Sequence, residues 1–261
     1  MCDTGAAPRR LDLLGLPLDH RSATEVDTWL ESALGEPWDS HCRHLVTLNP
    51  EYVIAARADP AFGDVIRAAD LVVADGIGIV LAVRLIHKVH VPRITGVELT
   101  GRLVDLGAGF GAPAFLLGGG PGVADRAAIR LVQHKPGRHV AGAWDGGTSA
   151  RADDIESLGR IGKSGARIVL VAYGAAGQVG WIARNQEELA RSGVRLAIGV
   201  GGAFDFLSGT VPRAPRPIRR LGLEWLYRLV REPWRWRRQL ALPRFAALVL
   251  ITAARRGQPR P

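Results

Sequence analysis

The chain has 261 residues, of which 47% are hydrophobic and 23% are charged, a composition that excludes an intrinsically disordered protein. No run reaches the roughly 18 apolar residues of a membrane span, and Asp12 and Asp19 interrupt what would be a signal peptide. Two cysteines, Cys2 and Cys42, are too few for a disulfide scaffold or a multi-cysteine zinc site and are typical of a reducing compartment. We therefore expect a soluble, cytoplasmic protein.

Positive charge is concentrated at the C-terminal end. Residues 211–261 contain thirteen arginines and two glutamates, a formal charge of +11. Because the whole chain carries +9, residues 1–210 carry −2. We therefore divide the chain into a nearly neutral body, residues 1–209, and a basic appendage, residues 210–261. The charge of the appendage predicts a polyanionic partner: nucleic acid, anionic lipid or a phosphorylated substrate.

The body alternates between strand and helix patterns after a short apolar hairpin at residues 11–18. Short runs rich in Val, Ile and Leu predict buried strands at residues 44–48, 71–74, 114–118, 167–172 and 194–199. Helical patterns lie between them at residues 51–57, 77–87, 97–106, 123–134, 151–161 and 178–191. This alternation predicts an α/β fold with a mostly parallel sheet and helices on both faces, in which ligands bind beyond the carboxyl ends of the strands.

The first predicted strand is followed by Thr-Leu-Asn-Pro-Glu at residues 47–51. Asn49 is a good helix N-cap, with Pro50 at the first helical position and Glu51 placed favourably for the helix dipole. Thr47 and Asn49 can equally direct polar groups into a ligand cleft. The two interpretations are compatible, and we keep both.

The second predicted strand ends in Asp75 and Gly76. Asp-Gly is an ordinary turn pair. A carboxylate at the end of a buried strand, beside a glycine that allows a ligand close to the backbone, is also where a general base would lie. The residues alone leave both interpretations open.

Glycine clusters follow two other predicted strands, at residues 118–122 and 199–202. Exposed backbone amides of Gly118, Gly119 and Gly201 would suit the phosphates of a nucleotide diphosphate. The alternative is tight packing between strand and helix. The clusters do not fit the Gly-x-Gly-x-x-Gly fingerprint, which disfavours a nicotinamide cofactor.

Several standard sites are missing from the sequence: Asp-x-Asp, His-Glu-x-x-His, Gly-x-Ser-x-Gly and Walker A. His41 with His44, and His87 with His90, have metal-binding spacing but lack obvious partners other than Cys42. We interpret them as surface or helix-end histidines and predict no metal site. Arginines are then the groups available to neutralise phosphate.

The appendage combines arginine with tryptophan. Apolar residues between 218 and 231 fall on one helical stripe, and Trp234 and Trp236 precede an apolar stretch at 240–254 that is too short and too interrupted to span a membrane. This composition is typical of interfacial membrane contact. There are two alternatives: the appendage binds nucleic acid, or it is a helix docked on the body with a solvated basic face.

Together these segments resemble the WecG/TagA/CpsF glycosyltransferases of bacteria, glycosyltransferase family 26, which include N-acetylmannosaminyltransferases of cell-surface polymer synthesis. The resemblance covers roughly residues 11–245, and the segment 221–229 (Leu-Gly-Leu-Glu-Trp-Leu-Tyr-Arg-Leu) is among its most specific parts. The other segments that carry it are 47–51, 74–78, 93–96, 116–119, 199–205, 213–215 and 232–233.

The resemblance implies a Rossmann-like catalytic body and an appendage that closes over the active site and touches the membrane. It implies a metal-independent, inverting enzyme without a cofactor, which uses a UDP-sugar donor and a polyprenyl-diphosphate-linked sugar acceptor. Asp75 matches the family's proposed catalytic base. The matches to its pocket residues are Thr47, Asn49, Arg93 and Gln178. We expect Arg213, Arg219 and Arg220 to stabilise the departing UDP.

One segment departs from the family pattern. The family usually carries Gly-x-Pro-Lys-Gln-Glu after its fifth strand, and residues 174–179 read Gly-Ala-Ala-Gly-Gln-Val here. Gln178 is retained, whereas the Pro, Lys and Glu are replaced. The leading hypothesis is a glycosyltransferase of cell-surface polysaccharide synthesis, peripheral on the inner face of the plasma membrane, with no nucleic-acid partner. The alternatives are a non-catalytic relative that binds nucleotide sugar or lipid, and a nucleic-acid-binding α/β protein. A homo-oligomer is left open.

Overall fold

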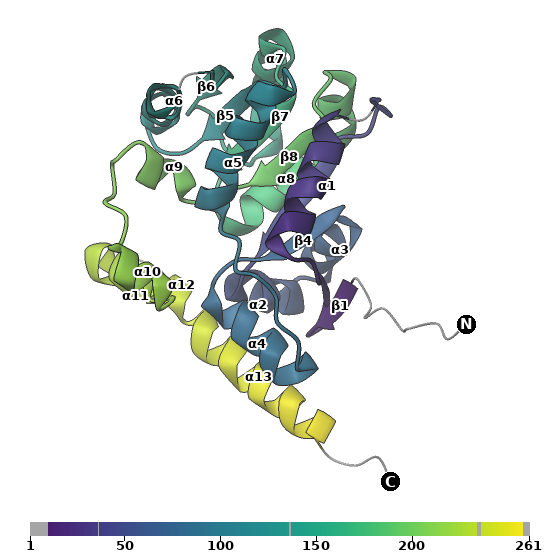
Figure 1. Cartoon of the computed structure of the whole chain (residues 1–261), viewed down its shortest axis with the longest axis vertical. Coiled ribbons are helices and arrows are strands. Elements are labelled where there is room, and N and C mark those ends of the chain that lie inside the picture. The colour runs from purple at the N-terminus through teal and green to yellow at the C-terminus, as the bar shows by residue number, and fades with distance from the viewer. Residues whose placement is uncertain (1–9, 36, 136, 234–235, 258–261) are drawn as a thin grey trace.

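A computed structural model describes residues 10–35, 37–135, 137–233 and 236–257, so Cys2, Trp234 and Arg235 lie outside the described residues. Its centre is a six-stranded parallel sheet in the order β4-β3-β8-β7-β5-β6 (Figure 1). The strands are β3 Arg43–Leu48, β4 Leu71–Ala74, β5 Ala114–Gly118, β6 Val140–Trp144, β7 Ile168–Ala172 and β8 Leu196–Gly199. The predicted parallel α/β sheet is confirmed.

Helices cover both faces of this sheet. They are α1 Ala23–Gly35, α2 Pro50–Ala58, α3 Pro60–Ala68, α4 Ile77–His87, α5 Gly96–Gly109, α6 Val123–His134, α7 Asp154–Ser164, α8 Ala175–Arg191 and α9 Ala203–Leu207. Side chains alternate along each strand, so Leu116 joins the core beneath α5 and α6, whereas Leu117 joins the core beneath α7 and α8. The predicted covering of both faces is therefore confirmed.

The predicted hairpin is an antiparallel pair, β1 Arg10–Leu13 with β2 Leu16–Asp19. Four elements of the body were not predicted: α1, α3, β6 and α9. The edge strand β6 reads Val-Ala-Gly-Ala-Trp and is only partly buried, so it lacks the apolar run of a central strand.

The appendage forms α10 Arg216–Arg220, α11 Glu224–Arg231, α12 Trp236–Gln239 and α13 Ala241–Gly257. The apolar stripe predicted across residues 218–231 is not one continuous helix. Gly222 breaks it, because its φ of +74° belongs to the left-handed region that favours glycine. Pro243 does not break α13, since it lies in the first turn of that helix.

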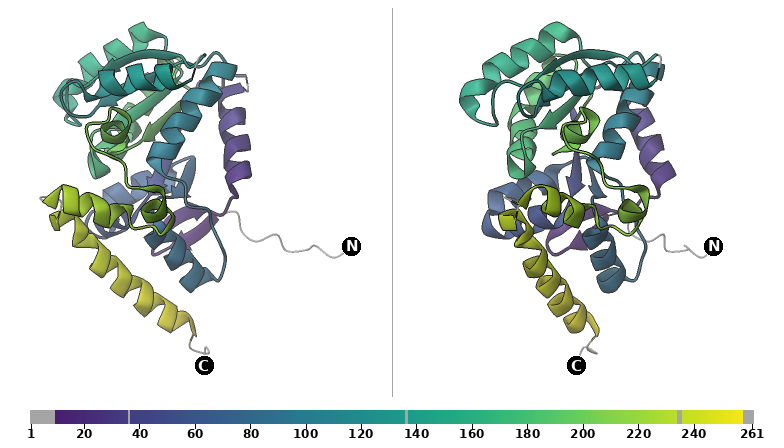
Figure 2. Two further views of the ribbon diagram at one scale, coloured as in Figure 1. Left: turned by 60° about the vertical axis from the view of Figure 1, so that its left-hand side comes forward. Right: turned by 90° about the vertical axis from the view of Figure 1, so that its left-hand side faces the viewer.

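Helix α13 packs against α2 and α4 of the body (Figures 1 and 2). Its side chains Phe245 and Val249 are buried in the same apolar cluster as Tyr52 of α2 and Ile79 of α4. Within the described part of the chain, no helix has the length and apolar character needed to cross a membrane.

Candidate functional site

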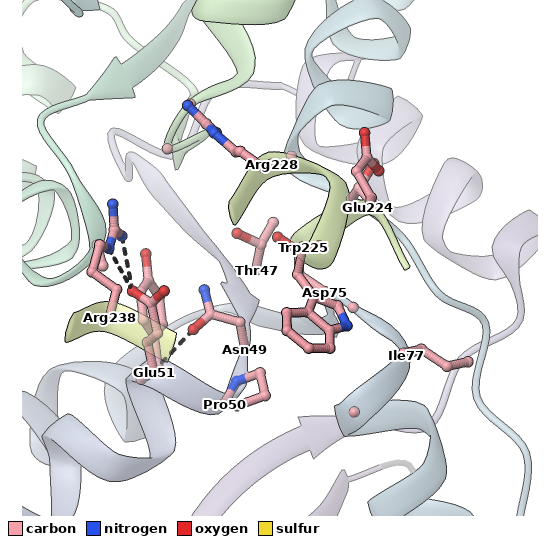
Figure 3. Close-up of a pocket in the computed structure, with 18 of the residues that line it drawn as sticks. Thr47, Asn49, Pro50, Glu51, Asp75, Ile77, Glu224, Trp225, Arg228 and Arg238 are labelled. Atoms are coloured by element: carbon pink, nitrogen blue, oxygen red, sulfur yellow. Dashed lines mark hydrogen bonds and ion pairs between the residues drawn. The ribbon is translucent and has the colours of Figure 1, made fainter. Parts of the chain in front are cut away.

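A cavity of about 830 Å³ lies beyond the carboxyl ends of β3, β4, β7 and β8. This is where open parallel sheets bind ligands. The body supplies the floor, and the appendage contributes Trp225 and Arg228 from α11 and Arg238 from α12 (Figure 3). The cavity therefore lies between two parts of the chain that are far apart in the sequence.

Asp75 lies in this cavity directly after β4, where its backbone amide donates to the carbonyl of Leu48 at 2.8 Å. Gly76, with a φ of +92°, turns the chain at once into α4. Burial raises the pKa of the Asp75 carboxyl to about 7, opposed by nearby Arg93 and reinforced by Glu224 and Glu98. A carboxylate with this pKa can exchange a proton near neutral pH.

Thr47 and Asn49 reach the same cavity from the end of β3. The Thr47 hydroxyl donates to the Gly199 carbonyl at 3.3 Å, which links β3 to β8. The Asn49 side chain accepts from the amide of Tyr52 at 3.1 Å and so caps α2. Both interpretations of Asn49 therefore hold, since it caps a helix and lines the cavity.

Gln178 of α8 is 2% exposed, and both ends of its amide are engaged by the protein. Its Nε2 donates to the Tyr52 hydroxyl at 2.7 Å, and its Oε1 accepts from the amide of Gly201 at 3.0 Å. A Cβ on Gly199 would lie 2.7 Å from this side chain, so the strand end must be glycine for Gln178 to fit. Gln178 thus ties α8, α2 and the turn after β8 together at the cavity wall.

Gln178→Leu should lower the free energy of unfolding by about 1–3 kcal/mol, because it leaves the buried Tyr52 hydroxyl and the partly buried Gly201 amide without their partner. Urea denaturation followed by circular dichroism measures the loss. Gln133→Leu on the exposed side of α6 is the matched control. A loss for Gln178→Leu no greater than that of the control would show that these two hydrogen bonds do not stabilise the fold.

Of the four arginines predicted to bind substrate, only Arg93 lines the cavity. Arg93 lines the cavity and donates to the carbonyl of Arg219 at 2.9 Å. Arg213 is paired with Glu224 at 3.4 Å and Glu98 at 3.7 Å. The side chains of Arg213, Arg219 and Arg220 do not line the cavity in this conformation.

Two other arginines of the appendage do line the cavity. Arg228 pairs with Asp205 at 2.6 Å and with Glu232 at 2.5 Å, and Arg238 pairs with Glu51 at 2.8 Å. Neither of them is among the predicted site residues, although Arg228 belongs to the segment 221–229. No local pattern shows that they reach the cavity, because they come from helices α11 and α12 of the appendage and not from a strand end.

The glycine clusters divide between packing and the cavity. Gly119 and Gly201 line the cavity, and Gly118 does not. A Cβ on Gly118 would lie 2.8 Å from the Tyr173 ring, so close packing requires glycine there. The amide of Gly122, at the start of α6, donates to the carboxylate of Asp145.

The histidines form no metal centre among the residues that the structure describes, since no three His, Cys, Asp or Glu side chains there are grouped so that they could hold a metal ion. His41 is paired with Asp70 at the surface. The prediction of a surface or helix-end position is wrong for His44, because β3 lies between β4 and β8 and buries it. Burial lowers the pKa of His44 to about 4.

Comparison with known proteins identifies the family. The profile described as "Glycosyl transferase WecG/TagA/CpsF family" matches residues 11–259. The N-acetylglucosaminyldiphosphoundecaprenol N-acetyl-beta-D-mannosaminyltransferase of Bacillus spizizenii is 35% identical over 206 residues, covering 79% of this chain and 78% of that protein. The protein of the same name from Bacillus subtilis is 34% identical over 204 residues, covering 78% and 77%. A match of this extent, with the cavity at the strand ends, means that the chain belongs to the WecG/TagA/CpsF family and is a glycosyltransferase.

Proposed function

We propose that this glycosyltransferase moves a sugar from a UDP-sugar to a polyprenyl-diphosphate-linked sugar during synthesis of a cell-surface polysaccharide. The relatives are named for an N-acetylglucosaminyl-diphosphoundecaprenol acceptor and an N-acetylmannosaminyl donor group. N-acetylmannosamine or a related hexose is therefore the proposed donor sugar. The cavity of about 830 Å³ is within the range of sites that bind ligands of this size.

The observation that carries the proposal is the position of Asp75 on the cavity floor, with a pKa raised to about 7. In the proposed reaction, Asp75 removes the proton from an acceptor hydroxyl as its oxygen attacks the anomeric carbon of the donor. The bond from that carbon to the UDP oxygen breaks, and UDP leaves with the electron pair. A single displacement of this kind inverts the anomeric configuration.

The leaving UDP needs positive charge in a partly dehydrated site. Arg213, Arg219 and Arg220 remain our proposed candidates, although reaching the cavity would require Arg213 to leave Glu98 and Glu224. We add Arg228, which already lines the cavity beside Gly202. Its bonds to Asp205 and Glu232 hold its guanidinium in place before a donor arrives.

We propose that the reaction needs no metal ion, because arginines take the role that a metal would have at the diphosphate. EDTA should therefore leave the rate of transfer unchanged. The rate is measured with and without EDTA, and then with added Mg²⁺ or Mn²⁺. Inhibition by EDTA that either ion reverses would contradict the proposal.

The rate should depend on pH through Asp75. Because a general base must be deprotonated, kcat/KM should rise about tenfold per pH unit below about pH 7 and level off above it. Initial rates in buffers of constant ionic strength give the profile. A flat profile down to about pH 5 would place the pKa of the essential base near its ordinary value and contradict the raised pKa of Asp75.

We also propose that the enzyme is peripheral on the inner face of the plasma membrane. The appendage exposes Leu221, Leu226, Val230 and Trp236 beside its arginines, which suits contact with an anionic lipid surface. The lipid-linked acceptor would be presented at that surface.

A donor screen tests the proposed reaction. The enzyme is incubated with a short-chain polyprenyl-diphosphate sugar and a panel of UDP-sugars, and the products are identified by mass spectrometry. Addition of one sugar to the acceptor from one or more UDP donors is expected. Binding of UDP-sugar without transfer from any of them would favour the non-catalytic alternative.

A further inference from the structure

We propose that a groove between α4 and α13 binds the first isoprenoid units of the acceptor's lipid chain. This inference rests on the proposed function, because it assigns a place to one part of the proposed acceptor. Figures 1 and 2 show the two helices side by side, running away from the sheet.

Helix α4 is apolar on its exposed side as well as on its buried side. Ile79 and Val83 are buried in the body, whereas Leu81 and Leu85, one turn apart on another face, remain 55% and 38% exposed. Leu250 of α13, which lines the cavity with them, is 63% exposed. A single exposed leucine needs no explanation, but three that line one cavity from two neighbouring helices form an apolar lining that suits an apolar ligand.

This apolar surface is continuous with the catalytic cavity. The cavity that contains Asp75 extends along Ile77, Leu81 and Leu85 of α4. A second cavity of about 520 Å³ is lined by Leu81, Arg84, Leu85 and Lys88. The two cavities meet at Leu81 and Leu85, which line both. The rise of 1.5 Å per residue gives this path a length of about 12 Å from Ile77 to Leu85.

The chemistry changes along the path in the order that a lipid-linked sugar requires. The inner end holds Asp75 and Arg93, and the middle is formed by leucines. Exposed Arg84 and Lys88 lie at the outer end, where cations would face the phosphates of a membrane surface. Because the prenyl chain is covalently attached to the reacting sugar, it must leave the site along some wall. This wall matches a chain without hydrogen-bonding groups.

The proposal is tested with acceptors that carry the same sugar diphosphate on a methyl group or on one, two or three isoprenoid units, each below its micelle-forming concentration and without vesicles. In the wild type, KM should fall by at least roughly fourfold per added unit until the groove is filled, since each methylene that becomes fully buried contributes about that factor in affinity. Leu85→Glu and Leu250→Glu should make KM almost independent of chain length. Ile155→Glu on α7, far from the groove and 86% exposed, should keep the wild-type dependence.

Calorimetry with a prenyl diphosphate alone separates failure of the groove from failure of the proposed reaction. Weaker binding of this probe to Leu85→Glu than to the wild type supports the groove even if no acceptor is glycosylated. Equal binding, or an unchanged dependence of KM on chain length in Leu85→Glu, overturns the proposal. If Leu85→Glu keeps that dependence but loses vesicle binding or dissociates a dimer, the face contacts a membrane or a second copy instead.

Discussion

Asp75→Asn is expected to lower kcat by about 10² to 10⁴-fold, the usual contribution of a positioned general base. Asparagine keeps the shape of the side chain and can still accept from the backbone of Gly96, but it cannot take the proton of the acceptor hydroxyl. Single-turnover rates at saturating donor measure the loss. UDP affinity should stay near the wild-type value, because Asp75 is not assigned a contact with the nucleotide.

The stability of the same variant provides an independent check. The folded state of the wild type binds more protons than the unfolded state between about pH 4 and pH 7, so Asp75 lowers the free energy of unfolding as pH rises through this window. Asp75→Asn should therefore be more stable than the wild type above pH 7, and the difference should vanish below pH 4. Turnover within a few-fold of the wild type would remove Asp75 from the mechanism.

Ending the chain after Gly209 is expected to reduce turnover by more than about a thousandfold and to abolish binding to anionic vesicles. The truncation removes Trp225, Arg228 and Arg238 from the cavity wall, together with a net charge of +11. It also removes Phe245 and Val249 from the cluster that they form with α2 and α4. Turnover and vesicle sedimentation are measured on the same preparation.

Point variants separate chemistry from folding and membrane contact. Arg228→Ala should lower kcat on a soluble acceptor by about 10²-fold, the cost of losing one electrostatic donor. Arg216→Ala, an exposed arginine of α10, is the matched control and should keep wild-type turnover. Trp236→Ala should weaken vesicle binding and spare turnover on the soluble acceptor. Full activity of the truncated chain on a lipid-linked acceptor would show that the appendage is neither lid nor anchor.

Much of the body could be predicted because its signals are local. Apolar runs mark the central strands, and Asn49 and Pro50 mark the start of α2. Helix α3 was missed although Asp59 and Pro60 give it the same start signals, because its apolar pattern is short. The edge strand β6 was missed because its residues are only partly buried and need no continuous apolar run.

The site was predictable as far as the strand ends and no further. Thr47, Asn49, Asp75, Arg93 and Gln178 follow from strand endings and from the family resemblance, and the structure brings all five to one cavity. Arg228 and Arg238 reach the cavity only because the appendage folds back over the body. A left-handed turn at Gly222, whose Cβ would lie 2.6 Å from Ile77, places α11 over the cavity. The periodicity of the sequence does not predict that turn.

Ion pairs hold the appendage on the body, so ionic strength should affect the docking of the appendage as well as its attraction to lipid. Glu51 with Arg238 and Glu98 with Arg213 are partly open to solvent, and salt screens such pairs over about 8 Å at physiological concentration. Arg228 with Asp205 is more enclosed and is screened less. Added salt therefore loosens the outer attachments of the appendage before the inner one. Salt dependence measured with a soluble substrate reports on this docking, whereas the same titration on vesicles adds the loss of lipid attraction.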